Sequence, residues 1–134
     1  MPSAAQTFRA LPLHGAPLWL LRLEGAVLLL AASWFYASFG LGWLWYLVLF
    51  LAPDLSMLFY FAGVRLGAIA YNFAHTTLPP FILGGVGELA GNHTALALAA
   101  IWFAHIGFDR MLGYGLKYAT GFQDTHLGRI GRGT

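Results

Sequence analysis

The chain has 134 residues, of which 59% are hydrophobic and only 9% charged, and its net charge is +2. Apolar sequence this continuous exceeds what the core of a soluble domain of this size can bury, so we expect one integral membrane domain over residues 1–134. The absence of cysteine excludes disulfides and thiolate metal sites. The net charge is too small to suggest a nucleic-acid partner.

Two apolar stretches in the first half of the chain predict a pair of membrane-spanning helices. A helix needs about 20 residues to cross a bilayer, and the stretches Leu18–Ser38 and Gly42–Ala62 have this length. Only Phe39–Leu41 separate them, so we expect an antiparallel hairpin. The residues before Leu18 are not apolar enough for a cleavable signal peptide, and we expect the first span to be retained.

The second half of the chain predicts two further spans, which makes an all-α bundle of four transmembrane helices. The third span is expected at Val64–Gly84, where Pro79 and Pro80 should kink it or end its regular part. The glycine-rich segment Gly84–Asn92 is interpreted as a loop. The fourth span is expected at Thr94–Lys117.

The distribution of basic residues predicts the orientation of the bundle. With the spans given above, one side of the membrane holds all of them: Arg9, Arg22, Arg65, Arg110, Lys117, Arg129 and Arg132. The positive-inside rule places that side in the cytoplasm. We therefore expect both termini, and a polar tail over residues 118–134, on the cytoplasmic face of a bacterial inner membrane, in contact with membrane lipid.

Ionisable and amide side chains interrupt the apolar spans at a common depth. A charge at the bilayer centre costs roughly 2.5–3.5 kcal/mol on insertion scales, so such residues usually pair, bind an ion or take part in chemistry. At a rise of about 1.5 Å per residue, all of them map to the cytoplasmic half of the membrane. They are Glu24, Asp54, Asn72, His75, His105 and Asp109.

The types and spacing of these residues predict a metal site. His105 and Asp109 are four residues apart, so they share one helix face. Helical bundles build metal sites from histidines and carboxylates on facing helices, and such ligands suit Zn, Fe or Mn. We predict that Asp54, His75, His105 and Asp109 bind one or two divalent metals. The alternative is a network of hydrogen bonds and ion pairs that only fixes helix packing.

Three further residues are candidates for catalytic roles around this metal. Glu24 would act as a base or extra ligand, and Asn72 would orient a ligand from outside the coordination sphere. His126 would reach the site if the tail folds back beneath it, or would belong to a basic tail that meets lipid headgroups. Asp54 follows Pro53, so it has the alternative role of capping the helical segment after that proline.

Four segments of the chain resemble a family of small bacterial membrane proteins that is known as a domain of unknown function. They are Pro53–Met57, Tyr71–Thr76, His105–Tyr118 and Asp124–Arg129. The resemblance implies a four-span membrane protein and brings no activity. The order of the Pro-Asp, His-Thr and His–Asp elements is also similar to membrane-bound metal-dependent hydrolases, although Ser56 stands where that pattern has a second aspartate. This second similarity implies hydrolysis.

These observations lead to two functional hypotheses. The first is a metal-dependent membrane hydrolase that acts on a lipid or another amphiphilic substrate. The second is a non-enzymatic accessory subunit of a larger membrane complex or homo-oligomer, in which His75 or His105 could bind a haem or a chlorin. A carrier for protons or small solutes ranks last, because four spans without an internal repeat would require dimerisation.

Overall fold

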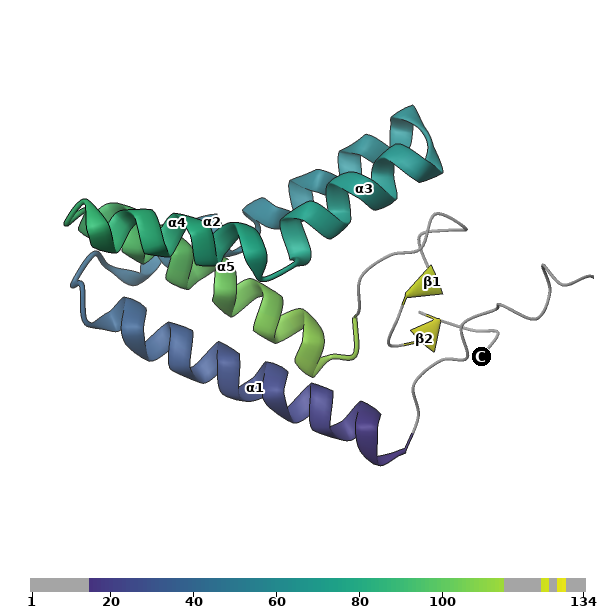
Figure 1. Cartoon of the computed structure of the whole chain (residues 1–134), viewed down its shortest axis with the longest axis horizontal. Coiled ribbons are helices and arrows are strands. Elements are labelled where there is room, and N and C mark those ends of the chain that lie inside the picture. Colours follow the sequence, from purple (N-terminus) through teal and green to yellow (C-terminus); the bar gives the residue numbers. More distant parts are fainter. Residues whose placement is uncertain (1–14, 115–123, 126–127, 130–134) are drawn as a thin grey trace, which may run out of the picture.

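The computed structural model describes residues 15–114, 124–125 and 128–129, and the all-α fold class is confirmed there. Figure 1 shows the helices folded into antiparallel neighbours. Two strands of two residues each pair antiparallel near the C-terminus, with Asp124 opposite Arg129. In chain order the elements are α1 (Ala16–Ala37), α2 (Trp43–Phe50), the 3₁₀ helix η2 (Ala52–Ala62), α3 (Val64–His75), α4 (Leu78–Leu89), α5 (His93–Met111), β1 (Asp124–Thr125) and β2 (Gly128–Arg129).

The first two predicted spans correspond to α1 and to α2 followed by η2. Their turn is short, and the Tyr36 hydroxyl donates a hydrogen bond to the Gly42 carbonyl across it at 2.6 Å. The second span changes from α to 3₁₀ geometry just before Pro53, because proline has no N–H for the α-helical bond and its ring clashes with the preceding turn. Beyond this point the Asp54 N–H bonds the Leu51 carbonyl three residues back, at 3.1 Å.

The third predicted span is divided into two helices. α3 ends at His75, Thr76 is extended, and α4 begins at Leu78 with Pro79 and Pro80 in its first turn. Proline lacks the N–H that a position inside a helix needs but is tolerated in a first turn, so α3 ends before the two prolines and a new helix begins with them, as expected.

The prediction of a loop over Gly84–Asn92 is wrong, because α4 continues to Leu89 and only a short turn follows. Gly87 explains the error. It is buried in the helix, and a Cβ atom there would lie 2.9 Å from the Ala95 Cβ of α5. The glycine therefore serves close helix packing rather than a flexible connection.

The fourth predicted span corresponds to α5, which is shorter than expected. It begins at His93, where the Asn92 side chain accepts a hydrogen bond from the Ala95 N–H, as helix N-caps do. It ends at Met111 rather than Lys117, and Gly113 follows with a left-handed φ of 86°. The predicted residues 115–117 lie outside the described part of the chain.

α5 is the central helix of the bundle and packs against α1, α2 and α4. Its contact with α1 brings two backbones together, since Gly25 of α1 faces Gly107 of α5 and a Cβ on either would lie 2.7 Å from the other's carbonyl oxygen. The η2–α3 hairpin, whose two helices pack on each other, extends away from α1 (Figure 1).

Two segments of the described chain are long and apolar enough to cross a membrane, Ala16–Ala37 and Trp43–Ala62. Only 11% and 6% of the most apolar 18-residue stretch of each segment is buried, so these helices expose their apolar side chains. The helix Leu78–Leu89 is apolar but shorter. Trp34 illustrates the exposure, with 81% of its surface accessible.

Candidate metal centre

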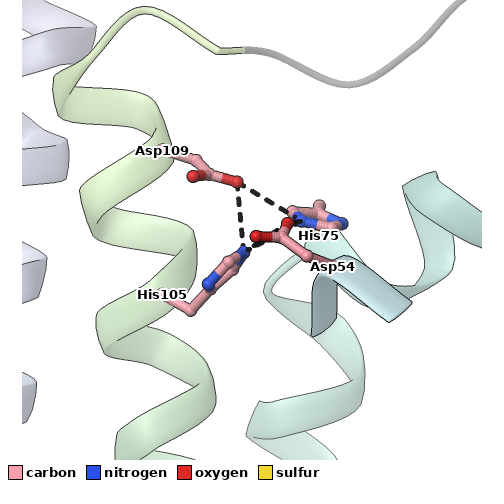
Figure 2. Close-up of side chains that lie close together, drawn as sticks. All are labelled: Asp54, His75, His105 and Asp109. Atoms are coloured by element: carbon pink, nitrogen blue, oxygen red, sulfur yellow. Dashed lines mark hydrogen bonds and ion pairs between the residues drawn. The ribbon is translucent and has the colours of Figure 1, made fainter. Parts of the chain in front are cut away.

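The four predicted metal ligands converge where the η2–α3 hairpin meets α5. Asp54 lies in the first turn of η2 and His75 is the last residue of α3. His105 and Asp109 lie one turn apart on the facing side of α5. Figure 2 shows the two imidazoles and two carboxylates pointing to a common centre.

The ligand atoms of this group are closely spaced. The two Nε2 atoms are 3.0 Å apart. Oδ1 of Asp54 lies 3.2 Å from both of them, and Oδ2 of Asp109 lies 3.3 Å from that of His75 and 3.2 Å from that of His105. No two of the four ligand atoms are more than 4.8 Å apart.

This spacing fits the coordination sphere of a small divalent metal. Four ligands at 2.0–2.1 Å from a tetrahedral zinc are separated from each other by about 3.3–3.4 Å. Five of the six distances between the ligand atoms, 3.0–3.3 Å, are close to that edge length, and the sixth, between the two carboxylate oxygens, is at most 4.8 Å. A His/Asp group of this kind could hold a metal ion, and two carboxylates balance the charge of a divalent one.

The surroundings of His75 fix its tautomer in the form that binds metal. Nδ1 of His75 lies 2.8 Å from the Tyr71 carbonyl oxygen. A carbonyl only accepts hydrogen bonds, so Nδ1 carries the proton and, in the neutral ring, Nε2 keeps its lone pair toward the centre. The Tyr71 ring also stacks on the imidazole at 3.7 Å, nearly parallel. Such partners orient metal-binding histidines.

Hydrogen bonds alone satisfy this arrangement poorly. An imidazole nitrogen carries one proton or one lone pair, yet each Nε2 has three polar neighbours within 3.3 Å. If both rings were protonated, the two Nε2–H groups would face each other across 3.0 Å. A single cation at the centre would instead use one lone pair from each of His75 and His105 and one from each carboxylate.

Three of the four ligand side chains of the centre are buried, and the fourth is partly exposed to solvent. The side chains of His75, His105 and Asp109 are 4%, 2% and 12% exposed, whereas that of Asp54 is 34% exposed. The Phe50 ring covers His105 edge-on at 5.2 Å. The N-cap position of η2 is occupied by Leu51 and not by Asp54, and the Asp54 carboxylate faces the two histidines.

The other predicted site residues are placed differently. Glu24 is exposed on α1 and is not one of the four converging ligands. Asn72 is half-buried on α3, one turn before His75, and His126 lies outside the described residues. The contacts of Tyr71 with His75 were not foreseen from the sequence. Its place four residues before that histidine is the signal that could have suggested them.

Comparison with known proteins identifies the family. Residues 19–130 match the family described as "Domain of unknown function (DUF4260)". The chain belongs to this family. The predicted resemblance to a family known as a domain of unknown function is thereby confirmed, and all four ligands of the candidate centre lie within the matched range. No curated protein and no solved structure matches the chain.

Proposed function

We propose that this protein is an integral membrane enzyme that uses a divalent metal to hydrolyse an amphiphilic substrate. The observation that carries the proposal is the convergence of two imidazole nitrogens and two carboxylate oxygens from three helical segments. The proposed ligands are Asp54, His75, His105 and Asp109.

The exposed apolar helices support the membrane part of the proposal. In the proposed topology, α1, the α2–η2 pair, the α3–α4 pair and α5 each cross the bilayer once, with both termini in the cytoplasm. The low burial of the two longest apolar segments fits helices whose side chains face lipid. Trp34, Trp43 and Trp45 are exposed around the α1–α2 turn, as expected for an aromatic belt at one interface.

The burial of the ligands supports a role in catalysis. A divalent metal held here would lower the pKa of a water molecule at a coordination position that the four side chains leave open, and this water would supply a nucleophile near neutral pH. His75, fixed by the Tyr71 carbonyl, and His105, covered by Phe50, would hold their positions during a reaction. Asp54 is the most exposed ligand, so substrate and water would approach on its side, where its carboxylate can accept a proton.

An accessory role in a larger membrane complex is the second candidate, favoured by the apolar surface of the η2–α3 hairpin. Leu58, Phe61 and Ile69 are 59%, 91% and 59% exposed there, and a partner subunit would cover them. A haem held by both imidazoles does not fit, because two axial imidazoles stand on opposite sides of the iron, whereas Nε2 of His75 and of His105 are only 3.0 Å apart. A haem or chlorin bound by one of the two histidines stays a prediction.

Metal analysis of the purified protein tests the proposal. Wild type in mild detergent should hold a stoichiometric divalent metal, and His105→Ala should lose it. His93→Ala is the matched control, because His93 begins the same helix but is exposed and outside the ligand group. Retention of full metal by His105→Ala, or a wild type that binds none on reconstitution with Zn, Fe or Mn, would refute the metal centre. A stoichiometric partner subunit would favour the accessory role.

A further inference from the structure

An apolar groove lies beside the metal centre, between the η2–α3 hairpin and the helices α4 and α5. Its volume is about 780 Å³, within the range of about 300–1,000 Å³ that small-molecule sites occupy. Phe59 of η2, Ala70 and Phe73 of α3, and Leu98 and Trp102 of α5 are among the residues that line it.

The chemistry of the walls defines what the groove can hold. In the described part of the chain, only Ser56 and Trp102 bring polar side-chain atoms to the lining. The Ser56 hydroxyl donates to the Pro53 carbonyl at 2.8 Å, and the Trp102 indole N–H donates to the Ala74 carbonyl at 2.6 Å. Polar groups of a ligand would be buried here without partners, at a cost of several kcal/mol, so the matching occupant is hydrocarbon.

Several residues of the groove wall are neighbours of the metal ligands along the chain. Two of its wall residues, Pro53 and Ala74, directly precede Asp54 and His75. Trp102 lies three residues before His105, and thus on the same side of α5. A chain held in the groove would therefore carry its polar end to the level of the ligands, where Asp54 is the exposed one.

We propose that this groove binds one hydrocarbon chain of an amphiphile whose polar end meets the metal centre. The inference names the substrate class and rests on the proposed function for the chemistry at the polar end. The occupation of the groove itself is a separate property, measurable without turnover.

Fluorescence quenching by a fatty acid brominated in mid-chain tests the groove, because bromine quenches a tryptophan that it contacts. Delipidated protein in mild detergent is titrated with this probe. We expect a saturable component with one site per chain. Trp102→Phe should remove that component, and Trp34→Phe should leave it unchanged because Trp34 is exposed on α1, away from the groove.

Variants that fill the groove test the site while keeping Trp102, the tryptophan whose quenching is measured. Ala70→Phe should weaken the saturable binding at least tenfold, and Ile69→Phe, at a more exposed wall position, tests the same point if Ala70→Phe fails to fold. Ala62→Phe is the matched control, since Ala62 is exposed at the end of η2 and does not line the groove.

The outcomes separate this proposal from the metal centre. Quenching that grows with the ratio of probe to detergent and never saturates would show that the probe only partitions into the micelle, and would refute binding in the groove. Saturable binding that survives in both groove-filling variants would refute it as well. Metal content is measured on the same samples. Metal without saturable quenching refutes only the groove, and saturable quenching without metal refutes only the proposed function.

Discussion

The glycine contact between α1 and α5 gives the sharpest test of how the fold positions the site. Gly107 lies two residues after His105 and two before Asp109, both of them proposed metal ligands. A Cβ at position 107 would lie 2.6 Å from the Leu29 nitrogen and 2.7 Å from the Gly25 oxygen. Both neighbours are backbone atoms of α1, so no side chain can rotate away, and in Gly107→Ala the two helices must separate.

The size of the effect follows from these distances. Ordinary contact begins at 3.4 Å, so α5 must move by roughly 0.8 Å from the 2.6 Å position. Overpacking costs about 1–3 kcal/mol, whereas alanine in a helix is favoured over glycine by about 0.8–1.0 kcal/mol. Because only backbone can yield, we expect a net loss near 2 kcal/mol. A metal site tolerates errors of only about 0.2 Å, so metal affinity should fall as well.

Thermal unfolding followed by circular dichroism, together with metal content, measures both effects. Gly107→Ala should lower Tm by about 6–10 °C and lose metal. Gly85→Ala in α4 is the control, because the residue is exposed and a methyl group there would meet no atom within 4 Å, so its stability should be unchanged or slightly higher. A Gly107→Ala protein with wild-type Tm and full metal would refute the reasoning.

Three further predictions concern the centre itself. Asp109→Asn should weaken metal binding by more than about 100-fold in equilibrium dialysis, because it removes a direct ligand, and an affinity within a few-fold of wild type would exclude Asp109 from coordination. Tyr71→Leu removes the ring stacked on His75 and should weaken binding by about 10–100-fold, while Tyr71→Phe, which keeps the ring, should lose less. Metal occupancy should fall as the pH is lowered from about 8 to 5, because imidazole and carboxylate bind metal only when deprotonated; occupancy independent of pH would argue against histidine ligands.

The helices could be predicted from the sequence because their signal is length and apolar composition. The prediction failed at Gly84–Asn92, where a cluster of glycines was interpreted as a loop. Glycine frequency alone does not distinguish a flexible connection from a helix that packs closely on its neighbour. Gly87 belongs to the second kind, since its missing side chain makes room for Ala95.

The candidate site could be predicted only in part. Counting residues along a helix predicts how deep a residue lies along the span, but not the side of the helix on which its side chain lies. His75 and His105 were expected at one level, and their Nε2 atoms do meet. Glu24 was expected at the same level, but it lies on an exposed face of α1. That helix is apolar on every side, so its sequence carries no periodicity that distinguishes the inward face.

The two helix interruptions explain how ligands from separate helical segments reach one point. Asp54 follows the change to 3₁₀ geometry at Pro53, and His75 ends α3 just before Pro79 and Pro80 begin α4. In a membrane, interrupted helices are tolerated where they are buried in protein or line a cavity. Both interruptions lie beside the ligand group and the apolar groove. The same prolines thus turn the hairpin away from α5, open the groove and leave Asp54 and His75 facing the regular helix that carries the other two ligands.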